Sequence, residues 1–168
     1  MPSTPPAPLR IEAFADASAT VSDRVRLTSE ERARGRFVAR LESGVEAAIA
    51  LPRGATLRHG DRLRASDGRT VEVLAAPERL LHVDVADASA LARAAYHLGN
   101  RHVAVELRPG GLRVARDAVL ERMLRGLGLE PTPIDAPFDP EGGAYGQAHA
   151  HPGDAGRLAP VIHEYRRT

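Results

Sequence analysis

Histidines are the side chains of this chain best suited to metal chemistry, because the 168-residue sequence contains no cysteine. Without thiolates, a metal ion must be bound by imidazole, carboxylate or backbone oxygen, and disulfides and iron–sulfur clusters are excluded. His102 is the leading candidate. It follows Gly99-Asn100, which ends a helical pattern, and we predict that it is the first residue of a strand. An imidazole at such a boundary is held by the backbone and can still face solvent or a partner.

Two further histidines, His149 and His151, lie in a segment rich in glycine and proline. The spacing His-Ala-His brings two imidazoles within reach of one ion, although a tail without a role is an equally good interpretation. A transition metal needs about four to six donors, and one His102 supplies a single nitrogen. Two copies of His102 across a two-fold axis, together with the tail histidines, supply enough. We therefore predict a metal site of His102, His149 and His151 in a homodimer.

The other four histidines have simpler interpretations. His59 precedes Gly60-Asp61 in a turn and is expected to be exposed, and His82 lies inside an alternating strand, where packing or exposure explains it. His97 is on the polar side of a helix end, where a protonated ring would complement the helix dipole. Metal binding by His97 or His163 stays open at this stage.

The expected chemistry is that of a carrier. Imidazole sites bind nickel more tightly than cobalt and less tightly than copper, so an all-histidine site is expected to discriminate only weakly among Ni(II), Cu(II) and Zn(II). A site with an open side and ligands on a mobile segment favours release to a partner over permanent structural binding. No catalytic residue is predicted.

Composition indicates a folded protein without a polyanionic partner. Hydrophobic residues make up 43% of the chain, and the formal net charge is +1. No large field of one sign is therefore available to hold nucleic acid or a membrane. Residues 1–8 are proline-rich and lack the features of a signal peptide, so we expect a disordered leader and a cytoplasmic protein.

Residues 9–76 are predicted to form a small all-β domain. Apolar runs are separated by turn residues, and Ser43-Gly44 and Asp67-Gly68 are suited to hairpin turns. A small antiparallel barrel or sandwich is expected. Thr28 begins a capping box for one helical turn, whose arginines we interpret as a solvated face. The predicted strands are Leu9 to Phe14, Phe37 to Leu41, Val45 to Leu51, Arg62 to Ala65 and Val71 to Ala75.

Residues 77–135 are predicted to form a ferredoxin-like domain, in the order βαββαβ. Asp87 and Asp117 precede the two helical patterns as N-caps, and Pro109-Gly110-Gly111 separates the two middle strands. Residues 136–168 have no apolar periodicity, so we expect a flexible tail that contains histidine. The predicted class is α+β. The expected strands are Arg79 to Val85, His102 to Leu107, Leu112 to Ala115 and Leu129 to Ile134.

Several motifs stand in the order of a known family and cover most of the chain. This set resembles the UreE urease accessory proteins, which are nickel metallochaperones. The matching stretches are Leu51-Pro52-Arg53-Gly54, Gly60-Asp61, Tyr96-His97-Leu98-Gly99-Asn100-Arg101-His102, Val119-Leu120-Glu121-Arg122-Met123-Leu124, and Ala136-Pro137-Phe138-Asp139-Pro140-Glu141-Gly142-Gly143-Ala144-Tyr145-Gly146.

The resemblance implies a homodimer that delivers Ni(II) for assembly of the urease active site. It implies a β domain akin to peptide-binding modules, a ferredoxin-like domain, and nickel bound at the dimer interface by the histidine that is His102 here. The implied partners are the urease apoprotein complex and the urease-associated GTPase. Some members carry further histidines where this chain has Arg116-Asp117-Ala118, so few ions per dimer are expected.

Two other functional classes compete with this interpretation. The chain could be an RNA-binding or protein-docking adaptor with a ferredoxin-like domain, but aromatic residues for base stacking make up only 4% of it. An enzyme with His102 as general base is the other class. No serine, carboxylate pair or phosphate loop stands near His102 in sequence.

Overall fold

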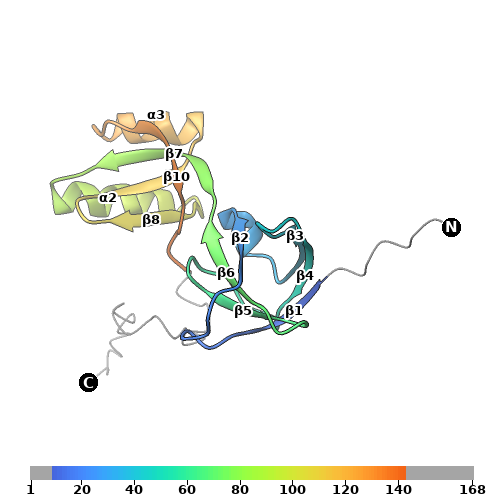
Figure 1. The fold of residues 1–168 in the computed structure, drawn as a ribbon. Helices are drawn as coiled ribbons and strands as arrows, with labels where there is room; N and C mark the ends of the chain where they lie inside the picture. Colours follow the sequence, from blue (N-terminus) through green and yellow to red (C-terminus); the bar gives the residue numbers. More distant parts are fainter. Residues whose placement is uncertain (1–8, 143–168) are drawn as a thin grey trace, which may run out of the picture.

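The structure is a computed structural model that describes residues 9–142. These residues form two domains, a six-stranded β domain and a four-stranded α+β domain (Figure 1). The predicted α+β class, with an all-β domain followed by a ferredoxin-like domain, is confirmed. The expected disordered leader and the stretch 143–168 of the expected tail lie outside the described residues.

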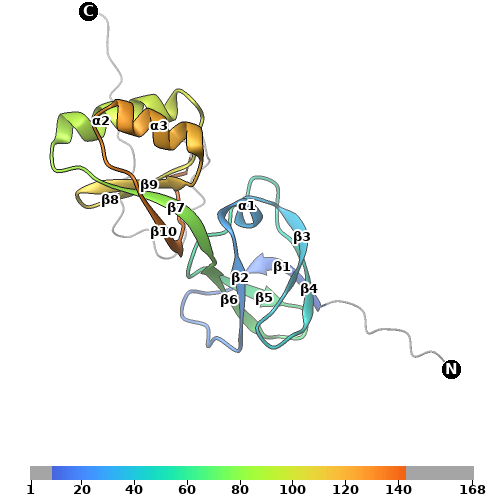
Figure 2. The same cartoon turned by 90° about the horizontal axis from the view of Figure 1, so that it is seen from above.

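The N-terminal sheet has the strand order β2-β6-β5-β1-β4-β3. Its pairing is mixed, because β1 runs parallel to β4 and β2 runs parallel to β6. The expectation of an antiparallel sheet is therefore wrong for these two pairs. The amide of Glu42 donates to the carbonyl of Arg24 at 2.8 Å, so the sheet curls until its two edges meet (Figure 2). The strands are β1 (Leu9–Phe14), β2 (Asp23–Leu27), β3 (Arg36–Arg40), β4 (Glu46–Ala50), β5 (Arg62–Ala65) and β6 (Thr70–Ala75).

The two predicted hairpin turns of this domain are present. Gly44 and Gly68 adopt φ of 87° and 88°, the left-handed conformation that such turns require. Alternate strand residues point inward and form one apolar cluster, which excludes water from the centre of the curled sheet. Its most buried members include Ile11, Val25, Leu63, Val71 and Val73.

The short helix α1 (Ser29–Arg32) begins with the predicted capping box, in which Thr28 and Glu31 cap each other. Arg32 contradicts the expectation of a solvated face, because it is only 3% exposed. One guanidinium nitrogen donates to Asp139 Oδ1 at 2.7 Å, and the other donates to the carbonyl of Phe138. Since Asp139 and Phe138 follow the last strand of the second domain, Arg32 ties the two domains together.

The second domain has the strand order β10-β7-β9-β8, and every pair in it is antiparallel. Both of its helices cover the same face of the sheet (Figure 2). This is the ferredoxin-like arrangement. Within residues 9–142, no helix is long and apolar enough to cross a membrane. The elements are β7 (Pro77–Asp84), α2 (Ala88–Gly99), β8 (Val105–Arg108), β9 (Gly111–Ala115), α3 (Ala118–Gly126) and β10 (Thr132–Pro137).

The last strand and the chain after it differ from the prediction. β10 runs to Pro137 instead of ending at Ile134, and Phe138 is 1% exposed. Farther on, the amide of Glu141 donates to the carbonyl of Val105 in β8 at 2.8 Å. Residues 136–142 therefore pack on the protein, which corrects the predicted start of the tail at residue 136. The buried Phe138 side chain, the hydrogen bond of its carbonyl with Arg32 and the bond between Glu141 and Val105 order this stretch, although its sequence has no apolar periodicity.

Candidate functional site

Helix α2 carries the candidate site at its C-terminal end and is fixed at its other end by Asp87. The Asp87 carboxylate accepts hydrogen bonds from the amides of Ser89 and Ala90 at 3.3 and 3.0 Å and from the Ser89 hydroxyl at 2.7 Å. The hydroxyl of Ser89, followed by the two amides, lowers the pKa of Asp87 below its ordinary value of 3.8. Ala94 and Leu98 bury the inner face of the helix.

The depressed pKa of Asp87 predicts how the helix responds to acid. Because the folded pKa lies below the unfolded one, the ionised cap stabilises the fold above the unfolded pKa, and this stability is lost as pH falls through the folded pKa. We therefore expect Asp87→Ala to lower the unfolding midpoint in urea at pH 7. Its difference from the parent protein should shrink below pH 4, as urea titrations over this range would show. A difference that persists unchanged in acid would contradict the role of the carboxylate.

His102 lies in the turn that follows α2 and not at the start of a strand, because β8 begins only at Val105. Its φ is 53°, and it is the only residue other than glycine with positive φ in residues 9–142. The His102 amide donates to the carbonyl of Gly99 at 2.9 Å, and the Val103 amide donates to that of Leu98 at 3.3 Å. This pair of bonds is the Schellman ending of a helix, and His102 occupies the left-handed position usually taken by glycine.

The left-handed conformation has a cost and a consequence. For a residue with a Cβ it costs about 1 kcal/mol or more, and histidine is one of the few types enriched there. Val103 packs against the apolar core beside buried Leu98, which fixes the turn on both sides of His102. The His102 side chain is exposed. The turn therefore presents an imidazole to solvent on a backbone that the hydrogen bonds and the core hold in place.

The structure assigns the other described histidines to local contacts. His59 Nδ1 accepts from the amide of Ala75 at 3.2 Å, and His82 Nε2 lies 3.0 Å from Asp84 Oδ1. The ring of His97 is half-buried and meets Tyr96 edge-on, with centroids 5.4 Å apart. His59 is exposed, as predicted, and its ring also accepts a hydrogen bond from a backbone amide.

A complete metal site is not formed by one copy of the described chain. Within residues 9–142, no three side chains of histidine, aspartate or glutamate converge in a way that could hold a metal ion. The other predicted ligands, His149 and His151, lie outside the described residues, as does His163. The part of the chain that the structure describes thus contributes His102 alone from the predicted set of ligands, on an exposed turn.

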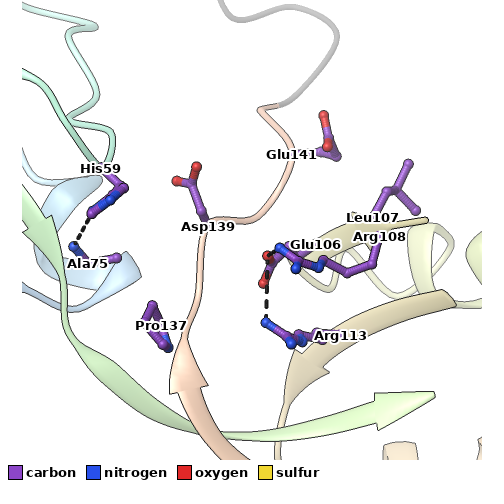
Figure 3. Close-up of a pocket in the computed structure, with 9 residues that line it drawn as sticks. All are labelled: His59, Ala75, Glu106, Leu107, Arg108, Arg113, Pro137, Asp139 and Glu141. Carbon is purple, nitrogen blue, oxygen red and sulfur yellow. Dashed lines mark hydrogen bonds and ion pairs between the residues drawn. The ribbon is translucent and has the colours of Figure 1, made fainter. Parts of the chain in front are cut away.

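Sequence reasoning missed a second group of polar residues, Glu106, Arg108 and Arg113, on the sheet face opposite the helices. Glu106 Oε1 accepts from Arg108 at 3.1 Å and lies 3.9 Å from an Arg113 nitrogen. The three residues line a cavity between the domains (Figure 3). The alternation of side chains along paired strands places Glu106 and Arg113 on the same face of the sheet. This pattern is the signal in the sequence that could have identified the group.

The fold and the exposed imidazole define a two-domain α+β protein with a histidine presented on a rigid turn. Family models agree with this class. The UreE urease accessory protein N-terminal domain matches residues 9–76, and the C-terminal domain of the same family matches residues 78–165. The chain belongs to the UreE urease accessory protein family. Its members are named urease accessory proteins, in agreement with the expectation that this protein is not an enzyme.

Named relatives give the same assignment. The chain is similar to the urease accessory protein UreE of Dechloromonas aromatica, with 46% identity over 162 residues, 86% of this chain and 92% of the relative. It is 50% identical to that of Burkholderia ambifaria over 129 residues and 54% identical to that of Cupriavidus pinatubonensis over 125 residues. These two alignments cover 77% and 74% of this chain but only 64% and 57% of the relatives, less than two thirds of their length.

Proposed function

We propose that this protein is a nickel carrier that takes part in urease maturation and binds Ni(II) through His102. Membership of the UreE family supports the role in maturation. The observation that carries the nickel assignment is the exposed His102 imidazole on a turn fixed by backbone hydrogen bonds. Imidazole nitrogen suits Ni(II), and Zn(II) and Cu(II) compete for the same ligand.

The proposed site needs a second copy of the chain. One exposed imidazole is too few donors for a transition metal, whereas a two-fold axis beside His102 brings two together. Because β8 runs parallel to β7 and β9 runs antiparallel to both, α2 ends and α3 begins at the same end of the sheet. Exposed Tyr96 and Val119, 66% and 63% accessible, lie on these helix ends. These apolar side chains are the contact that we propose for the homodimer.

The remaining donors and the partners complete the proposal. His149 and His151 add imidazoles to the paired His102 rings, and the β domain serves as the docking surface. The recipients are the urease apoprotein complex and the urease-associated GTPase, in the cytoplasm. RNA binding is disfavoured, because the central strands β7 and β9 carry no phenylalanine, tyrosine or tryptophan on which a base could stack.

Nickel calorimetry combined with native mass measurement tests the proposal. We expect the metal-free protein to be a dimer that binds one tight Ni(II) per two chains. His82→Gln, which removes an imidazole from the sheet, should leave that stoichiometry unchanged. If the parent protein bound nickel tightly as a monomer, the proposal of a site shared between two copies would be refuted.

Truncation after Tyr145 tests the role of the tail. The shortened protein should remain a dimer and bind nickel more weakly, because the paired His102 imidazoles stay and the donors of His149 and His151 are lost. Imidazole binds metal only when deprotonated, and an unperturbed histidine titrates near pH ~6.5. The difference in affinity between the two proteins should therefore be larger at pH 8 than at pH 6. Equal affinities at both pH values would show that the tail histidines do not bind the metal.

A further inference from the structure

Arg101 directly precedes His102, and its side chain is held at the C-terminal end of α2. The Arg101 amide donates to the carbonyl of Leu98 at 3.0 Å and not to that of His97, which would be its α-helical acceptor. A guanidinium nitrogen of Arg101 donates to the His97 carbonyl instead, at 3.2 Å. The exposed side chain therefore folds back onto the helix end and keeps its charge there.

The positive charge of Arg101 is not balanced by a carboxylate. Its bond to the His97 carbonyl is its only polar side-chain contact within residues 9–142. Arg116 and Asp117 precede α3 at the same end of the sheet, and their opposite charges offset each other. Arg101 therefore adds one uncompensated positive charge beside the exposed imidazole of His102.

This charge acts against the attraction that the helix end exerts on a cation. The C-terminal end of a helix carries a partial negative charge, which stabilises a positive ion bound there. The guanidinium of Arg101 lies on a carbonyl of that end, so it offsets the partial charge and repels a divalent ion. In a dimer with a shared site, two copies of Arg101 repel one ion.

We propose that Arg101 weakens nickel binding at His102 and thereby favours release of the ion to a recipient. This inference rests on the proposed nickel site and adds a residue that sets its affinity. A protonated guanidinium is not a metal ligand, because it has hydrogen-bond donors and no acceptor. Arg101 therefore acts on the ion through charge alone. A carrier must release what it binds, and repulsion both lowers the affinity and speeds dissociation.

Coulomb's law and screening by salt set the size of the effect. The screening length is about 30 Å in 0.01 M salt, about 10 Å in 0.1 M salt and about 3 Å in 1 M salt. Two unit charges, each about 10 Å from a divalent ion in water, weaken its binding about eightfold in 0.01 M salt and about threefold in 0.1 M salt. In 1 M salt the effect disappears. A role of the charge is therefore recognised by its dependence on salt.

Nickel calorimetry of the full-length protein at these three salt concentrations tests the proposal. The measurements are made at pH 8, where an unperturbed histidine is already deprotonated, so a change in affinity reports repulsion of the ion. Arg101→Gln removes the charge and keeps an N–H donor for the His97 carbonyl. We expect this variant to bind nickel about eightfold more tightly in 0.01 M salt, about threefold more tightly in 0.1 M salt and like the parent protein in 1 M salt. Dissociation of nickel into a chelator should be slower by stopped-flow at low salt.

Two variants control for effects other than charge beside the site. Arg101→Lys keeps the charge and loses the planar guanidinium, so its nickel affinity should equal that of the parent protein at each salt concentration. Arg93→Gln removes an exposed arginine of the same helix, about two turns before Arg101. The Arg93 guanidinium also donates to a carbonyl, that of Leu127 at 3.3 Å. In 0.1 M salt this variant should bind nickel as the parent protein does.

Three results would overturn the role of Arg101. These are parent-like affinity of Arg101→Gln in 0.01 M salt, a gain in affinity that persists in 1 M salt, and an Arg101→Lys variant that binds as tightly as Arg101→Gln. The substitution His102→Gly separates this inference from the proposed function. If that variant loses nickel while Arg101→Gln binds like the parent protein, only the role of Arg101 is refuted. If His102→Gly still binds nickel tightly, the proposed site is refuted as well.

Discussion

Replacement of His102 by glycine is expected to abolish the tight nickel site while the fold becomes no less stable. The imidazole is the proposed ligand, and its loss from both copies in a dimer should weaken the tightest binding by more than about 100-fold. Glycine adopts the left-handed conformation of this turn, at φ 53°, without the steric cost of a Cβ. The free energy of unfolding should therefore stay the same or rise by up to about 1 kcal/mol.

His102→Ala is the matched control for this prediction. Alanine removes the same imidazole but keeps a Cβ in the left-handed turn, so His102→Ala should lose nickel equally and be less stable than His102→Gly. Nickel calorimetry and urea unfolding of the three proteins measure both effects. Tight nickel binding by either variant would refute His102 as the ligand. A glycine variant less stable than the alanine variant would contradict the account of the turn.

The sequence predicted the local elements well, because their signals are short-range. Asp87 and Asp117 were identified as helix N-caps, and the side chains of both accept hydrogen bonds from backbone amides at the start of their helices. The glycines at Ser43-Gly44 and Asp67-Gly68 indicated hairpins that the structure contains. In each case one polar side chain or one positive φ decides the local structure, so a few neighbouring residues suffice.

The pairing of strands that are far apart in the sequence was harder to predict. β2 (Asp23–Leu27) was missed although its residues alternate between buried and exposed. Its partner β6 lies far away in the chain and runs parallel to it, and no turn signal marks a pairing of this kind. The parallel pair of β1 and β4 escaped prediction for the same reason.

The candidate site was also predicted only in part, because its conformation depends on contacts that the sequence pattern does not show. His102 was identified as a residue at an element boundary, but its left-handed conformation depends on carbonyls of Leu98 and Gly99 that the helix aims at the turn. Arg32 was predicted to lie on a solvated face. It is buried where its guanidinium meets Phe138 and Asp139, in the chain after β10. Residues that are far away in the sequence decide whether a charged side chain is buried, and a local sequence pattern contains no information about them.

Gly111 is the position where the largest loss of folding stability is expected. It begins β9 and pairs with Asp84 of β7. A Cβ at this residue would lie 2.2 Å from the carbonyl oxygen of Val83, a backbone atom inside the central strand pair. Strand β9 cannot move away without disturbing the ladder on its other side, because Gly111 also pairs with Arg108 of β8. The clash must therefore distort the sheet that carries α2 and its turn.

Gly111→Ala should lower the free energy of unfolding by about 3 kcal/mol and the melting temperature by roughly 10 °C. Gly126→Ala is the matched control, because nothing lies within 4 Å of a Cβ there and the residue is in helix α3. That variant should be as stable as the parent or slightly more so, since alanine favours helix. Thermal unfolding followed by circular dichroism compares the three proteins. If Gly111→Ala melts with the parent protein, the close approach of β7 and β9 at this point is not a constraint on the fold.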